Sequence, residues 1–160
     1  METRKDRKRT DKFAAMREIW DKLISNCTTR YSPGEHTTID EQLLGFRGRC
    51  PFRIYIANKP AKYGIKLIMV CDAKTNYMLN ALPYPGKHTQ PHGRALAHYV
   101  TTKLVALYAS SKRNITGDNW FTSVPLVNDL LDNYNLTYVG TVRANKAQMP
   151  PEMIDKAAAH

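Results

Sequence analysis

The sequence predicts an α/β domain in which one mixed sheet, built in the order β-β-β-α-β-α-β, follows an amphipathic helix. Strand-like apolar runs lie at residues 37–44, 65–71 and 77–82. After position 95, runs with helical periodicity alternate with two further short strand-like runs. Three strands joined by short connections and followed by alternating helices and strands are typical of a mixed sheet with helices packed on it.

Length and composition are typical of one globular domain with a sizeable core. The chain has 160 residues, of which 42% are hydrophobic and 24% charged. It has no apolar run of 18 residues and no apolar segment behind its basic N-terminus, so we expect neither a transmembrane helix nor a secretory signal. Cys27, Cys50 and Cys71 are widely spaced, which speaks against a disulfide framework or a cysteine zinc site and fits a reducing compartment.

The net charge of +10 favours anionic partners, with nucleic acid as the first candidate. A basic protein without such a partner remains the alternative. The cluster Arg7, Lys8 and Arg9 is compatible with a nuclear import signal, so we expect a nuclear location.

Residues 11–26 are predicted to form the amphipathic helix, because apolar residues recur at steps of three and four. We interpret this helix as one that packs against the core, with binding of a partner as the alternative. Its apolar positions are Phe13, Met16, Ile19, Trp20, Leu23, Ile24 and Cys27.

The first predicted strand, at 37–44, places Asp40, Gln42 and Leu44 on one face and Ile39, Glu41 and Leu43 on the other. Residues 49–62 are predicted to form a basic loop, and 65–71 with 77–82 a hairpin. A helix is expected at 95–110, followed by a short strand that ends at Asp118. The next helix, at 123–133, has Ser123 as its cap, Pro125 in its first turn and Asn135 as its stop, and a last strand covers 136–143.

Asp40 and Asp118 are the candidate metal ligands. Each stands in or directly after a strand-like run, and carboxylates on neighbouring parallel strands, about 4.8 Å apart, can bind one Mg²⁺ together. Two-metal sites of this kind support phosphoryl transfer. A surface or capping role for each aspartate is the alternative.

Four blocks closely resemble piggyBac-type DNA transposases, in that family's order: residues 38–53 (TIDEQLLGFRGRCPFR), 58–66 (NKPAKYGIK), 118–123 (DNWFTS) and 139–143 (VGTVR). The resemblance implies an RNase H-like catalytic fold, and Mg²⁺-dependent DNA cleavage and strand transfer at TTAA sites. Asp40 and Asp118 match the first two of the family's three catalytic, metal-binding aspartates. Residues 1–36 would then be a basic arm and the end of the dimerisation and DNA-binding region, 37–149 a partial catalytic domain, and 150–160 a tail.

The family's third aspartate is not expected in this chain. Asp129 and Asp132 fall on the predicted helix at 123–133 as part of its solvated face, and Glu152 and Asp155 fall in the tail. We therefore expect a truncated catalytic domain that neither cleaves nor joins DNA alone. His88 and His92 are read as part of a polar loop and not as zinc ligands.

Two other functions remain open. A non-catalytic DNA-binding module would contact phosphates through basic side chains. An interaction protein would instead form a homodimer or pair with a full-length transposase through the early helix. The candidate phosphate contacts are Arg47, Arg49, Arg53, Lys59, Lys62, Lys112 and Arg113.

Overall fold

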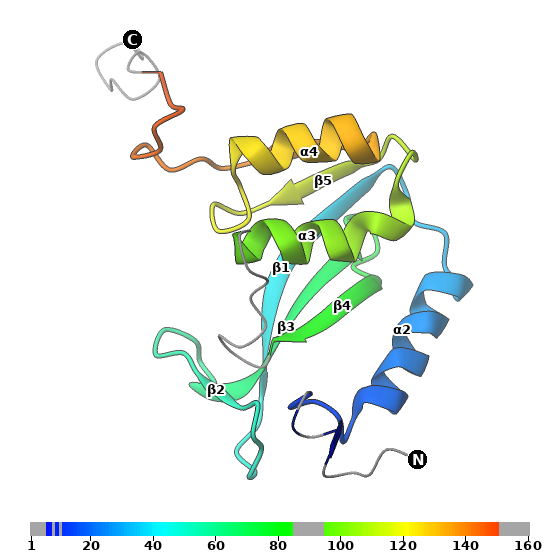
Figure 1. The fold of residues 1–160 in the computed structure, drawn as a ribbon, viewed down its shortest axis with the longest axis vertical. Helices are drawn as coiled ribbons and strands as arrows, with labels where there is room; N and C mark the ends of the chain where they lie inside the picture. Colours follow the sequence, from blue (N-terminus) through cyan, green and yellow to red (C-terminus); the bar gives the residue numbers. More distant parts are fainter. Residues whose placement is uncertain (1–5, 8, 10, 85–94, 151–160) are drawn as a thin grey trace.

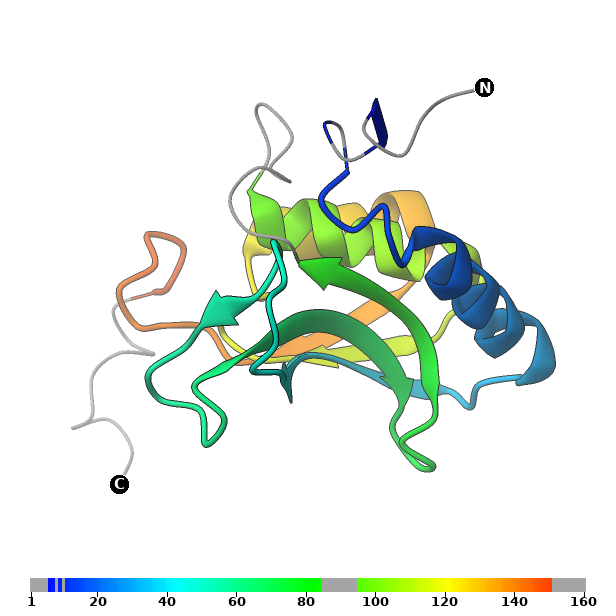
Figure 2. The ribbon, with the colours of Figure 1, turned by 90° about the horizontal axis from the view of Figure 1, so that it is seen from below.

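One mixed six-stranded sheet carries two helices on one face and a third helix at its edge in the computed structural model (Figures 1 and 2). The structure describes residues 6, 7, 9, 11–84 and 95–150. The elements are α2 (Arg17–Arg30), β1 (His36–Gly45), β2 (Ile54–Tyr55), β3 (Tyr63–Asp72), β4 (Met78–Tyr84), α3 (Leu96–Val105), the 3-10 helix η2 (Ala106–Tyr108), β5 (Asn114–Gly117), α4 (Val124–Tyr134) and β6 (Thr137–Gly140).

The predicted fold class is confirmed, and the predicted strands and helices occur in the predicted order with one additional strand, β2. The strands lie in the order β2-β3-β1-β5-β6, and β4 also pairs with β3. β1 is antiparallel to β3 and parallel to β5, and β5 is parallel to β6. The short strand β2 was not predicted, because residues 49–62 carry turn residues and charge in place of an apolar run. His88 and His92 lie outside the described residues.

The core lies between the sheet and the helices α3 and α4. Ile39 and Val70 are paired across β1 and β3, and both are buried beneath the helices with Ile115 of β5. Leu104 of α3 and Leu130 of α4 close the core from above. No helix of the described residues covers the opposite face of the central strands (Figure 2). That face carries the even-numbered residues of β1, because side chains alternate along a strand.

Helix α4 follows the local signals in its sequence. Ser123 caps it by accepting a 3.4 Å hydrogen bond from the Leu126 amide, and Pro125 stands in its first turn. Asn135 ends it at φ 51°, a left-handed conformation that asparagine tolerates.

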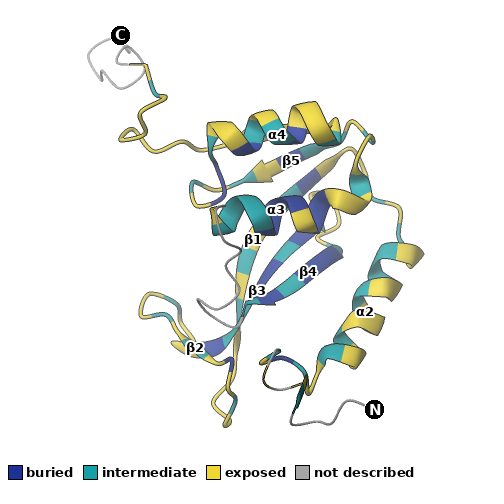
Figure 3. Cartoon of the chain, in the orientation of Figure 1, coloured by how far each residue is buried: buried dark blue, intermediate teal, exposed yellow. Residues whose placement is uncertain are grey.

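Helix α2 departs from its prediction: it begins at Arg17, and none of its residues is buried (Figure 3). Asp11 accepts a 2.8 Å bond from the Phe13 amide and a second from Arg17 Nε, which holds the preceding residues in turns. The helix lies along the edge strand β4 (Figure 1), where Trp20 Nε1 donates to the Ala81 carbonyl at 3.3 Å. A helix at the edge of a sheet contacts the sheet along a narrow line. Most of the apolar residues predicted for this helix therefore stay outside the core.

The consequence is an apolar surface on α2. Phe13, before the helix, is buried against Phe52, with ring centroids 4.9 Å apart. Ile19 is 67% exposed, and Met16 and Leu23 are exposed beside it. Whether residues 1–36 act as a separate arm and helix remains a prediction.

The described helices include none that is both long and apolar enough to span a bilayer.

Asp72 ties the start of β1 to the turn between β3 and β4. Its buried carboxylate accepts bonds from the amides of Gly34 at 2.8 Å and of Lys74 and Thr75 at 2.9 Å. These donors, with Gly34 the strongest, lower the pKa of Asp72 from 3.8 to about 2, although burial opposes them.

We expect the stability of the fold to fall as the pH drops from about 4 to about 2. The folded pKa of Asp72 lies below its unfolded value, so its stabilisation is complete above the unfolded pKa and is lost as the folded carboxylate takes up its proton. The variant Asp72→Asn should be less stable at pH 7 and should lose this part of the pH dependence. Urea midpoints at a series of pH values measure it; parallel curves for the two proteins would contradict the expectation.

Candidate metal centre and nucleic-acid surface

The two predicted metal ligands stand next to each other at the end of a parallel strand pair. The pairing of β1 and β5 runs from His36 and Asn114 to Ile39 and Gly117. The next residues along the chain are Asp40, within β1, and Asp118, directly after β5. Both are exposed. The parallel register therefore makes neighbours of two aspartates that are far apart in the sequence. Their role as metal ligands stays a prediction.

Each carboxylate keeps an oxygen available for a cation. Asp40 Oδ1 accepts the Glu41 amide at 2.7 Å, and Asp118 Oδ1 accepts the Trp120 amide at 2.9 Å. No described residue donates to the Oδ2 atom of either aspartate. Two exposed carboxylates with a free oxygen each suit Mg²⁺, which takes few protein ligands and retains water. The donor set thus fits a divalent cation.

Within the described part of the chain, no third acidic, histidine or cysteine side chain joins this pair. Glu41, the nearest acid in sequence, lies on the other face of β1, where its carboxylate binds Lys66 and approaches Lys59 Nζ at 3.9 Å. Lys66 Nζ also lies 5.2 Å from the centre of the Trp120 ring. Glu41 is therefore engaged in holding the two strands together.

The later acids do not complete the pair either. Asp129, expected on a solvated face, is half-buried and bonded to His98 Nε2, so that expectation was wrong: α4 turns this side toward α3. Asp132 is exposed on α4. Glu152 and Asp155 lie outside the described residues.

Asp118 is held by a turn that Tyr138 supports from β6. Thr122 Oγ1 bonds to the Asp118 carbonyl at 2.7 Å and to the Tyr138 hydroxyl at 3.0 Å. Burial raises the pKa of the Tyr138 phenol, and the charge of Asp118 adds to this, while the Thr122 bond opposes it. Tyr138 therefore remains a neutral hydroxyl group, which packs over Gly117 and fixes the start of the Asp118 turn.

The predicted phosphate contacts fall into two groups at opposite ends of β1. One group lies on the connections before and after β2, next to the end of β1, and consists of Arg47, Arg49, Arg53, Lys59 and Lys62. The other group, Lys112 and Arg113, directly precedes β5 and lies next to the start of β1. The ten residues of β1 span roughly 30 Å. The seven cations thus do not form one continuous patch.

Three of these cations support the fold. Arg113 donates to the carbonyls of Pro33 and Gly34 at 2.9 Å, and Arg53 donates to the carbonyl of Arg47 at 2.8 Å. Lys59 faces Glu41. The side chains of Arg47, Arg49, Lys62 and Lys112 make no hydrogen bond or ion pair with described residues, and so can meet phosphates.

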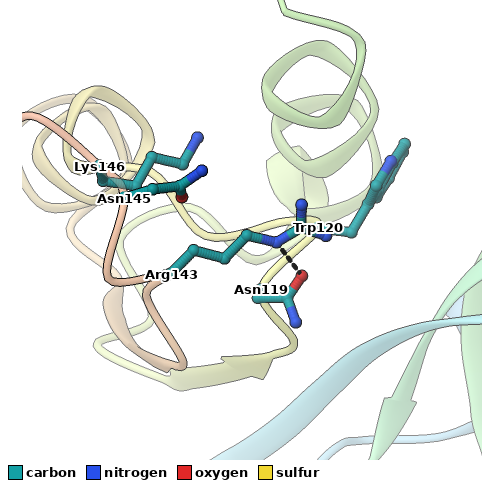
Figure 4. Close-up of a pocket in the computed structure, with 5 residues that line it drawn as sticks. All are labelled: Asn119, Trp120, Arg143, Asn145 and Lys146. Atoms are coloured by element: carbon teal, nitrogen blue, oxygen red, sulfur yellow. Dashed lines mark hydrogen bonds between the residues drawn. The ribbon is translucent and has the colours of Figure 1, made fainter.

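A further basic hollow, which was not predicted from the sequence, lies at Asn119 and Trp120, the two residues after Asp118 (Figure 4). Its volume is about 340 Å³, and Arg143 Nε donates to Asn119 Oδ1 at 2.9 Å across it. Lys146 and Trp120 also line it. Arg143 is the last residue of the block at 139–143, so the sequence contained a reason to consider it. No local pattern indicated that Arg143 lies next to Asn119, the residue after Asp118.

The comparisons with known proteins agree with this geometry. The family model described as Transposase IS4 matches residues 1–160. The chain belongs to the Transposase IS4 family. Human piggyBac transposable element-derived protein 3 is 28% identical over 156 residues, which are 92% of this chain and 25% of that relative. The human chimeric ERCC6-PGBD3 protein is also 28% identical over 156 residues, 92% of this chain and 14% of that relative.

A solved structure supports the fold of this transposase-family chain. A piggyBac transposase, determined by cryo-electron microscopy as a synaptic complex with hairpin DNA, is 55% identical and has a TM-score of 0.87. The match covers 92% of this chain and 31% of that one. The resemblance to piggyBac-type transposases and the α/β sheet fold are thereby confirmed. The chain spans only part of the length of each of these relatives, from 14% to 31%.

Proposed function

We propose that this chain is a part of a piggyBac-type catalytic domain that binds a divalent cation through Asp40 and Asp118 and holds DNA beside it. The observation that carries the proposal is the register of β1 and β5, which makes the exposed residues Asp40 and Asp118 neighbours at the end of the parallel pair. Asp40 and Asp118 would hold the divalent cation, which would supply Lewis-acid stabilisation of charge on a phosphodiester. Thr122 with Tyr138 keeps Asp118 in place.

DNA is the partner that the surface charges favour. Arg143 and Lys146 line the hollow at Asn119, the residue after Asp118. Arg47, Arg49 and Lys62 have no bonding partner among the described residues. These side chains suit phosphate contacts, whose strength falls steeply with salt. The solved relative is itself a complex with hairpin DNA. Cleavage at TTAA sites by the complete catalytic domain, of which this chain is a part, and a nuclear location belong to the same proposal.

Cleavage requires more than this pair. Because no third carboxylate of the described residues stands beside Asp40 and Asp118, we infer that the chain alone binds a cation weakly and does not cleave DNA. A homodimer, or pairing with a full-length transposase through α2, is a second role, favoured by the exposed Met16, Ile19 and Leu23.

The metal proposal is tested by titrating the protein with Mn²⁺, a paramagnetic substitute for Mg²⁺. We expect amide signals around Asp40 and Asp118 to broaden. Asp118→Asn should weaken Mn²⁺ binding by about tenfold or more, roughly 1.4 kcal/mol, because half of the anionic donor set is lost. Asp132→Asn, at an exposed position on α4, is the matched control and should bind as the wild type does.

Broadening that persists unchanged in Asp40→Asn and Asp118→Asn would rule out this pair as the metal site. A plasmid-nicking assay with Mn²⁺ tests the second part. We expect no nicking by the wild-type chain, and nicking that disappears in Asp40→Ala would show that the two carboxylates suffice.

A further inference from the structure

A hollow of about 830 Å³ opens beyond the end of β1, between the connections that flank β2. It is formed by Phe46 and Arg47 after β1, by Arg53, and by Lys62 and Tyr63 at the start of β3. The volume is in the range of sites that take small ligands or parts of larger ones. None of the described residues that line it is acidic.

Two tyrosines form an exposed aromatic pair at this end of the sheet. Tyr55 and Tyr63 are partners across β2 and β3, with ring centroids 4.9 Å apart. They are 55% and 49% exposed, in contrast to Phe121, which lies in the core. Each ring therefore has surface free to contact a planar ligand.

Arginine fixes the position of this pair. The Arg53 guanidinium carbon lies 5.1 Å from the centre of the Tyr63 ring, and Nη1 donates to the carbonyls of Arg47 and Gly48 at 2.8 and 3.1 Å. Arg53 thus joins the aromatic pair to the loop after β1, which carries Arg47. Arg47 and Lys62 keep their charges free at the rim.

The hollow continues the open face that carries the metal site. Asp40, Gln42 and Leu44 point to the same side of β1, and all three are exposed. Gly45, which also lines the hollow, is five residues beyond Asp40, a distance of about 17 Å along the strand. A nucleic-acid strand held at Asp40 can reach the tyrosines along this face.

We propose that this hollow binds an unpaired base of single-stranded DNA, stacked on Tyr63 next to Tyr55, with Arg47 and Lys62 on the flanking phosphates. Bases in a duplex already stack on their neighbours, so only an unpaired base offers its face to a side chain. The positive rim matches the phosphates of such a strand. The inference rests on the proposed DNA-binding function, which it deepens by naming the form of DNA that this site takes.

The test measures anisotropy of three labelled ligands: a single-stranded oligonucleotide, the same sequence as a duplex, and a single strand with abasic positions at its centre. We expect Tyr63→Ala to weaken binding of the normal single strand about tenfold and to leave binding of the abasic strand unchanged. Tyr63→Phe keeps the ring and should retain the wild-type affinity. Equal urea midpoints of the variants show that the fold is intact.

Arg47→Ala provides the contrasting variant. Because the partner of Arg47 would be a phosphate, this substitution should weaken the binding of all single-stranded ligands alike. It should also lower the slope of log affinity against log salt concentration by about one. Equal losses of normal and abasic strands in Tyr63→Ala would overturn the stacking site while leaving DNA binding in place. Failure of all three ligands to bind at low salt would overturn the proposed DNA-binding function as well.

Discussion

Leu104→Ala is expected to lower the free energy of unfolding by about 2–5 kcal/mol. Leu104 is 0% exposed and packs between α3 and the sheet, so truncation removes apolar contacts and leaves a cavity. Its carbonyl also accepts a 2.9 Å bond from Asn80 Nδ2, which secures the end of α3 to β4 and limits how far the helix can move to fill the space. Since a domain of this size is typically stable by about 5–15 kcal/mol, the loss would be a large part of the total.

Leu107→Ala is the matched control, because Leu107 belongs to the adjoining η2 and is 65% exposed. We expect it to change the free energy of unfolding by less than about 0.5 kcal/mol. Urea unfolding followed by circular dichroism measures both variants. Similar losses for the two leucines would show that α3 is not packed against the sheet as described.

Gly117→Ala is expected to cost about 1–3 kcal/mol of stability and to weaken metal binding. A β-carbon at this position would lie 2.2 Å from the Tyr138 hydroxyl oxygen and 3.0 Å from Ile39 Cγ2. Tyr138 is half-buried and bonded to Thr122, so its ring cannot move away freely. The backbone at position 117 would therefore have to shift, and this shift would also move the next residue, Asp118.

A double variant shows whether the hydroxyl is the cause. Tyr138→Phe removes the oxygen and, alone, should cost about 0.5–1.5 kcal/mol through the lost Thr122 bond. When Tyr138→Phe is combined with Gly117→Ala, the 2.2 Å contact is removed. The double variant should therefore lose at least about 0.5 kcal/mol less stability than the sum of the losses of the two single variants. Strict additivity, measured by urea unfolding, would mean that the strain arises elsewhere.

The candidate site was predictable to the extent that its signals are local. Alternation along β1 placed Asp40 on the face opposite the core residue Ile39. A short strand ending at Asp118 was predicted, and β5 ends one residue earlier, at Gly117. The helix α4 was bounded by Ser123 and Asn135, whose side chains and backbone act within a few residues. Patterns of this kind depend on neighbours along the chain and need no knowledge of the fold.

Contacts between distant segments decided the roles of several residues. Arg113 matched the pattern of a phosphate contact but binds the carbonyls of Pro33 and Gly34. Arg143 lay outside the predicted set but stands beside Asn119. A basic side chain has the same local signature in both roles, so only its spatial partner distinguishes them.

The sequence by itself determined the order of the elements other than β2, the face of β1 that carries Asp40, and the bounds of α4 to within one residue. Tertiary structure alone decided that β1 lies parallel to β5, that α2 runs along the edge of β4, and that Tyr55 meets Tyr63. The physical reason is separation along the chain. The bond from Thr37 Oγ1 to the Asn114 carbonyl joins residues 77 positions apart, and packing of the whole sheet selects such a pairing. That pairing is what sets Asp40 beside Asp118.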